Sequence, residues 1–148
     1  MAQRHACIYL CETVASTLHK ALLQSVAEKG SRLREVRKDL LRELPGMTQR
    51  WFQGPDGCDL FLWYDEAKGL SKIQLTFEKR AVEWSAAEGV RTAQLVSFNP
   101  LRPMEDQGRL VFDPRPDAET LDLARALLEN ASVDDVTLAI VRRRLGLR

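Results

Sequence analysis

Histidine and cysteine, which build many catalytic and metal sites, are scarce in this chain of 148 residues. It has two histidines and three cysteines. Three cysteines cannot form a closed set of disulfides, so the chain does not fit the pattern of a stapled secreted protein. We interpret them as reduced thiols in a cytoplasmic protein. A closed zinc site needs four convergent ligands, which these few residues do not supply, so we predict no metal and no cofactor.

The chain also lacks an excess of either charge and a long apolar run. Lysine and arginine number 22 and aspartate and glutamate 21, which gives a net charge of +1. This balance provides no overall attraction for nucleic acid, so a nucleic-acid partner is not favoured. No apolar stretch approaches the roughly 18 residues of a membrane-spanning helix, and we predict no membrane partner. The apolar run at residues 6–11 is too short for a signal peptide and ends at Glu12.

What is present is an ordinary globular composition, 45% hydrophobic and 29% charged. We expect a single domain over residues 1–148. Residues 46–98 contain its clearest pattern. Four short runs rich in aromatic and β-branched residues, 58–65, 70–78, 81–86 and 90–98, are separated by turn residues. They predict an antiparallel four-stranded β-meander, with Leu75 and Phe77 facing the core because alternate side chains share a face.

Helical patterns flank this meander. Apolar residues at spacings of three and four predict a helix over 6–28, within an N-terminal extension of residues 1–30. A second helix is predicted from Ser31 to Leu44, with one apolar and one charged face. Residues 117–146 predict two C-terminal helices, the first capped by Asp117 and the second started by a capping box at Ser132. Residues 47–53 and 109–112 are short extended pieces. The predicted fold class is therefore α+β.

The first helix carries more apolar surface than one packed stripe uses. Two explanations stay open. The helix pairs with a second copy of the chain, giving a homodimer, or the sheet and the C-terminal helices enclose it on two sides. We favour the homodimer.

Residues 45–98 resemble a family of short bacterial proteins. The resemblance is carried by RWF at 50–52, DLFLWYDE at 59–66, IQLTF at 73–77 and AVEW at 81–84. Family members carry R-W-F, D-L-hydrophobic-hydrophobic-W, hydrophobic-Q-L and A-L-T-W in the same order. Glu83 stands where the family usually has a hydroxyl residue, and the segment between the second and third strands is shorter. The resemblance implies the sheet, but the family has no established activity and so gives no catalytic residue.

No arrangement in the sequence indicates a catalytic mechanism, and whether the protein is an enzyme stays open. Both histidines, His5 and His19, lie in the first helix, and Cys7 and Cys11 lack further convergent ligands. The function favoured is a non-catalytic binding or interaction domain. One alternative is a small-molecule or catalytic pocket on the sheet face, and another is weak nucleic-acid binding by the basic faces of helix 31–44 and residues 142–144. The candidate contact residues are Trp51, Trp63, Gln74, Thr76 and Glu83.

Overall fold

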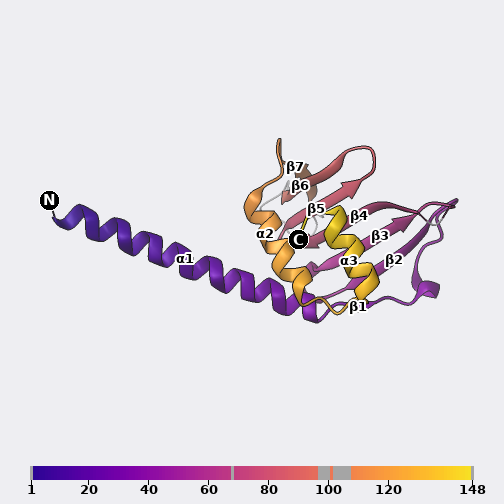
Figure 1. Cartoon of the computed structure of the whole chain (residues 1–148), viewed down its shortest axis with the longest axis horizontal. Coiled ribbons are helices and arrows are strands. Elements are labelled where there is room, and N and C mark those ends of the chain that lie inside the picture. The colour runs from indigo at the N-terminus through magenta and orange to yellow at the C-terminus, as the bar shows by residue number, and fades with distance from the viewer. Residues whose placement is uncertain (1, 68, 97–100, 102–107, 148) are drawn as a thin grey trace.

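The computed structural model describes residues 2–67, 69–96, 101 and 108–147, with side chains from residue 14 onward. Its fold is α+β, with three α-helices and one antiparallel sheet among these residues (Figure 1). The helices are α1 (Ala2–Ser31), α2 (Ala118–Glu129) and α3 (Asp135–Arg144). The strands are β1 (Arg34–Glu35), β2 (Thr48–Gln53), β3 (Asp59–Tyr64), β4 (Leu70–Phe77), β5 (Arg80–Ser85), β6 (Gly89–Val96) and β7 (Arg109–Phe112).

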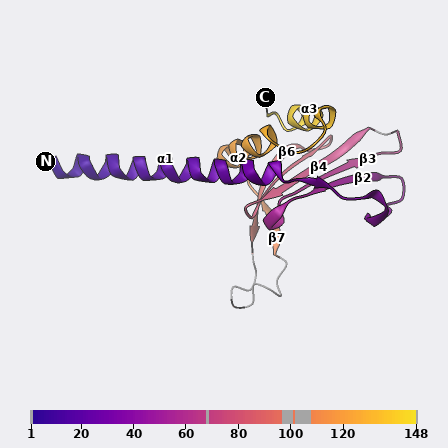
Figure 2. The same ribbon diagram turned by 90° about the horizontal axis from the view of Figure 1, so that it is seen from below.

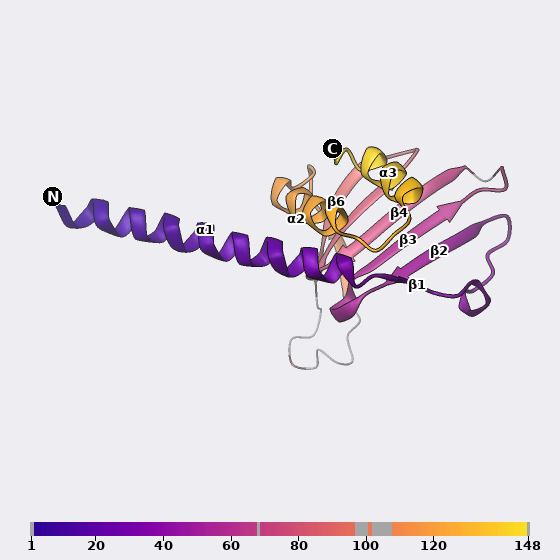
Figure 3. The ribbon, with the colours of Figure 1, turned by 60° about the horizontal axis from the view of Figure 1, so that its bottom comes forward.

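The sheet is a meander in which each strand pairs with its neighbours in the sequence, in the order β1 to β7 (Figure 3). The four predicted strands form β3 to β6. The prediction of four strands was nevertheless wrong, because the sheet has seven among the residues that the structure describes. Two of the others, β2 and β7, coincide with the predicted extended pieces. Their short patterns do not reveal that they pair with the meander.

The predicted helix from Ser31 to Leu44 does not form. Leu33 is fully buried in the core, Arg34 and Glu35 pair with β2, and the Val36 amide donates a hydrogen bond to the Trp51 carbonyl at 2.8 Å. Only a 3₁₀ turn, η1 (Lys38–Leu40), remains. Pairing with a distant strand has overridden a local helical pattern.

Helices α2 and α3 lie on the same side of the sheet (Figure 2). Strand side chains alternate between faces, so every second residue of the central strands points toward these helices. This face forms the core, with Leu62, Ile73 and Phe77 packed in one cluster with Leu123 and Leu127 of α2. We call the opposite face of the sheet the open face. The strand register places Trp51, Phe61, Trp63, Lys72, Gln74, Thr76, Glu83 and Arg91 on it.

The predicted first helix is confirmed and is a few residues longer at each end. Its C-terminal part packs on α2, with Val26 buried, and its N-terminal part extends away from the sheet (Figure 1). Gly30 lies inside the last turn of α1, where a Cβ would lie 2.0 Å from the Leu127 carbonyl oxygen. Glycine at this position permits the close approach of the two helices.

Matching N-caps start the two C-terminal helices. Asp117 caps α2 as predicted, accepting a hydrogen bond from the Thr120 amide at 3.0 Å. The prediction of a capping box at Ser132 was wrong, because the N-cap of α3 is Asp134, which accepts from the Thr137 amide. Both caps follow the pattern Asp-x-x-Thr, in which the carboxylate also accepts from the threonine hydroxyl.

Candidate binding surface

Three aromatic side chains form a row on the open face, which we call the aromatic strip: Trp51 of β2, and Phe61 and Trp63 of β3. The Trp51 and Phe61 rings stack at a centroid distance of 5.3 Å, and Phe61 and Trp63 at 5.6 Å. The Trp51 indole donates a hydrogen bond to the Asp59 carboxylate at 2.8 Å. All three rings are half-buried. The strip is therefore a continuous apolar row of stacked rings, in which the indole N–H of Trp51 already has a hydrogen-bond partner.

An ion cluster lies beside the strip. Glu83 is only 5% exposed, and each of its carboxylate oxygens has a cationic partner: Lys72 at 3.4 Å and Arg91 at 3.1 Å. These cations also contact rings, since Lys72 lies 5.3 Å from the centre of the Trp63 ring and Arg91 lies 3.9 Å from that of Phe112. With both oxygens engaged, Glu83 positions the two cations on the open face.

The structure places all five residues selected from the sequence on the open face. Gln74 pairs with Glu83 in the sheet register and lies between it and the aromatic strip. Thr76 is already engaged, because its hydroxyl donates to the Gly57 carbonyl at 3.3 Å. Sequence reasoning omitted Phe61, which joins the two tryptophans. Its alternation with Trp63 along one strand was the signal that could have identified it.

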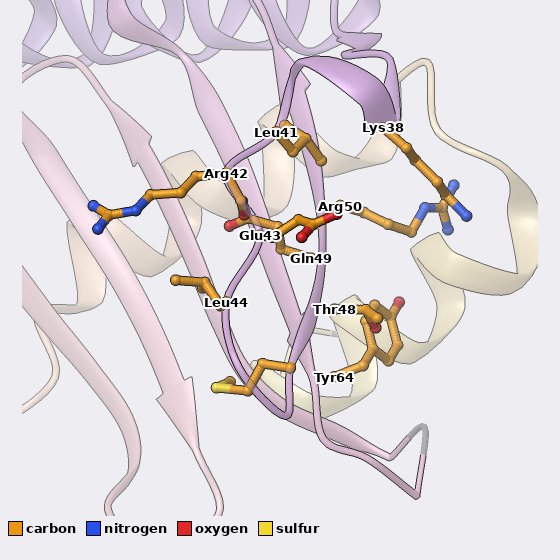
Figure 4. Close-up of a pocket in the computed structure, with 10 residues that line it drawn as sticks. Lys38, Leu41, Arg42, Glu43, Leu44, Thr48, Gln49, Arg50 and Tyr64 are labelled. Carbon is orange, nitrogen blue, oxygen red and sulfur yellow. The ribbon is translucent and has the colours of Figure 1, made fainter.

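A separate cavity of about 720 Å³ lies between β2 and the loop that precedes it (Figure 4). Leu44 stands at one side of it, while Thr48 and its strand partner Tyr64 stand at the other. The Gln49 side chain donates to the Arg42 carbonyl at 3.0 Å and so holds the loop against the strand. Sequence reasoning missed this cavity because it assigned the loop to a helix. The lining residues are Lys38, Leu41, Arg42, Glu43, Leu44, Met47, Thr48, Gln49, Arg50 and Tyr64.

Arg50 touches this cavity but is committed to the fold. Its guanidinium donates to Glu35 at 2.8 and 3.0 Å, to Asp134 at 3.0 Å and to the Thr137 hydroxyl at 2.7 Å. The hydrogen bonds to Arg50 lower the pKa of Glu35. Those from Thr137, with a smaller contribution from Arg50, lower the pKa of Asp134 to about 2.

Arg80 makes the equivalent contacts at α2. Its guanidinium donates to Glu119 at 3.1 Å and to the Thr120 hydroxyl at 3.2 Å. Each arginine thus fastens one strand to the start of one helix, and sequence reasoning identified neither. Both are structural residues.

The remaining reactive side chains do not form a second centre. Cys58 is buried, and burial raises the pKa of its thiol to about 11, which keeps it protonated and weakly nucleophilic at neutral pH. His19 lies 3.9 Å from Glu119. Cys7, Cys11 and His5 lie outside the described side chains. Within the described residues, no cluster of three histidine, cysteine or acidic side chains could hold a metal, and none of the helices has both the length and the hydropathy to cross a bilayer.

The proposed nucleic-acid contact through helix 31–44 loses its basis, because that helix and its basic face do not exist. Arg34 instead donates to the carbonyls of Ser31 and Leu33, and Arg37 pairs with Asp39. In α3, Arg144 lies over the Trp84 ring at 4.9 Å. These three arginines therefore serve local contacts.

No protein-family model, curated protein or solved structure matches this chain. The function is therefore inferred from the geometry of the open face and of the helices.

Proposed function

We propose that this protein is a non-catalytic binding module that recognises an extended peptide segment on its open face. The observation that carries this proposal is the aromatic strip. Three stacked, half-buried rings with nearly parallel planes provide a rigid apolar contact area with little loss of side-chain entropy on binding, as at many protein–peptide interfaces. Proline-rich and aromatic peptides use this kind of surface.

The charges of the open face favour a neutral partner. Lys72 and Arg91 both pair with Glu83, and Arg91 also pairs with Glu88 at 2.8 Å, so the two cations are balanced by two carboxylates. Binding of a nucleic-acid backbone requires cations that are free to neutralise phosphates. Cations already paired with carboxylates are better suited to form the polar rim of a peptide site.

The cavity beside β2 supports a second candidate function, the binding of a small apolar molecule. Its volume falls within the range of ligand sites, and Leu41, Leu44, Met47 and Tyr64 give it apolar walls. This cavity lies at the edge of the sheet and is separate from the sheet-face pocket considered from the sequence. If Leu44→Asp abolishes binding of a small apolar molecule while the aromatic strip is unchanged, the cavity is the binding site.

Three further features belong to the same proposal. We propose that the chain forms a homodimer through α1, that it acts in the cytoplasm, and that it shares its sheet with the short bacterial family it resembles. The exposed apolar residues of α1 support the first. The resemblance of residues 45–98 supports the last, and the scarcity of cysteine supports the cytoplasm.

Selection from a displayed library of random peptides tests the peptide site. We expect peptides enriched in proline or aromatic residues, and we expect Trp63→Ala and Trp51→Ala to weaken their binding by about tenfold or more. Trp84→Phe is the matched control, since Trp84 faces the helices, and it should leave binding unchanged. Circular dichroism confirms that each variant folds. Failure to enrich any peptide, or peptides that bind Trp63→Ala as tightly as the parent, would refute the site.

A further inference from the structure

The N-terminal half of α1 is exposed on every side over residues 14–18. Val14 is 56% exposed and Leu18 66%. Figures 1 and 2 both show this part of the helix projecting away from the sheet and from α2. A helix surrounded by water normally carries many charges, whereas residues 13–18 carry none. The projecting half therefore has the composition of a helix that another surface covers.

One stripe of α1 has the spacing of a coiled-coil seam. Positions 4, 7, 11, 14, 18, 21, 25 and 28 follow one another at alternating intervals of three and four residues, the heptad repeat. Leu23, Val26 and Gly30, which face α2, lie outside this stripe. Ala21 and Glu28 lie on it and are exposed, so the stripe remains accessible where α1 meets the rest of the molecule.

The charges on this stripe favour one relative direction for two paired α1 helices. Its six inner positions are uncharged, and most are small: Cys7, Cys11, Val14, Leu18, Ala21 and Ser25. Only the two terminal positions are charged, with Arg4 at one end and Glu28 at the other. Two parallel copies would place Arg4 beside Arg4 and Glu28 beside Glu28. Two antiparallel copies place Arg4 beside Glu28 at both ends, and like charges side by side are unfavourable.

We propose that two copies of this chain associate through an antiparallel pair of α1 helices centred near Ser16. This inference rests on the proposed homodimer and adds its geometry. Val14 of each copy then packs on Leu18 of the other, Cys11 on Ala21, and Cys7 on Ser25. Small residues at most layers allow a close approach of the two helices. The two sheets lie at opposite ends of the helix pair, because each is attached near the C-terminal end of its own α1.

Disulfide crosslinking separates the two directions. At a rise of about 1.5 Å per residue, the two Cys11 residues of an antiparallel pair lie about 15 Å apart along the axis, too far for a disulfide. Cys11 and position 21 of the other copy lie at the same height. We compare three variants under mild copper-catalysed oxidation: Cys7→Ala, Cys7→Ala with Ala21→Cys, and Cys7→Ala with Cys11→Ala and Ala21→Cys.

We expect a covalent dimer only from the second variant, which retains Cys11 and has a new thiol at position 21, with the two positions joined in the crosslinked peptide. Cys58 is buried in all three. Crosslinking of all three would show a parallel pair and overturn the direction while leaving the homodimer intact. A dimer by equilibrium sedimentation that crosslinks in none of them would also overturn it. A parent protein that stays monomeric at high micromolar concentration would instead refute the homodimer itself, and would indicate that a different partner covers α1.

Charge reversal provides an independent measurement. Arg4→Glu should raise the dissociation constant of the dimer about tenfold, and adding Glu28→Arg should restore it. Lys20→Glu is the matched control, since it changes a charge of α1 outside the stripe and should leave the constant unchanged. Equal effects of Arg4→Glu and Lys20→Glu, or no restoration in the double variant, would contradict the antiparallel pair.

Discussion

Replacing Gly30 with alanine sets two effects of opposite sign against each other. Alanine is more favourable than glycine inside a helix by about 1 kcal/mol, so local propensity alone predicts stabilisation. The packing of α1 on α2 predicts the reverse. The new Cβ would lie 2.0 Å from the Leu127 carbonyl oxygen and 2.9 Å from its carbonyl carbon. Both atoms belong to the backbone, so no change of side-chain rotamer relieves the contact.

The two helices must therefore separate by more than about 1 Å before the Cβ fits. Separation disturbs the fully buried Val26 and Leu127, and it weakens the hydrogen bond of 3.1 Å that the Gly30 carbonyl accepts from the Ser132 amide. Overpacking of this kind costs about 1–3 kcal/mol, and a rigid backbone neighbour favours the upper end of that range. After the gain in propensity is subtracted, we expect Gly30→Ala to lower the free energy of unfolding by about 2 kcal/mol.

Urea denaturation followed by circular dichroism measures this change. Ser16→Ala is the control for propensity, because Ser16 is exposed in the same helix, and it should raise stability by up to about 0.5 kcal/mol. Gly57→Ala is the control for loss of a glycine with open space around it, and its positive φ of 72° should cost about 1 kcal/mol. A Gly30→Ala protein at least as stable as the parent would show that α1 and α2 are farther apart than described.

Arg50 of β2 and its partner Asp134, the N-cap of α3, give two more predictions. Arg50→Met should lower the free energy of unfolding, measured by urea denaturation, by about 2 kcal/mol, because a half-buried cation with three partners is lost. The control is Arg37→Met, which removes an exposed arginine and should change this free energy by less than about 0.5 kcal/mol. The pKa of Asp134 is lowered from its ordinary value of 3.8 to about 2, so its stabilising effect is complete above about pH 4 and is lost as the pH falls through 2. Asp134→Asn should therefore reduce the fall in thermal midpoint between pH 4 and pH 2. An equal fall in the variant and the parent would contradict the assigned hydrogen bonds.

The parts of the fold that the sequence predicted are those with a strong local period. Alternation identified β3 to β6 and placed Leu75 and Phe77 in the core, and spacings of three and four identified α1, α2 and α3. The helix predicted over 31–44 had an equally regular pattern. It failed because Leu33 enters the core and the next two residues pair with β2, contacts that a local pattern does not reveal.

The candidate site shows the same limit. Period-two alternation explains why the selected residues share one face. Residues two apart in a strand point to the same face of the sheet, as Gln74 and Thr76 do, and so do directly paired residues such as Gln74 and Glu83. The role of Arg50 had no such signal. Its partner Asp134 lies 84 residues farther along the chain, and only the packing of α3 against the sheet brings them together.

The order of the strands has a consequence for the speed of folding. Each strand pairs only with its neighbours in the sequence, so the sheet can form hairpin by hairpin, and the loops to be closed between β2 and β6 are short. The helices make the distant contacts: α1 meets α2 across almost 100 residues at Gly30 and Leu127, and Arg50 reaches α3. Rates of folding fall as the mean sequence separation of contacts rises. We therefore expect the meander to form early and the docking of α1 on α2 to follow as the slow step, governed by the close approach of the two backbones at Gly30.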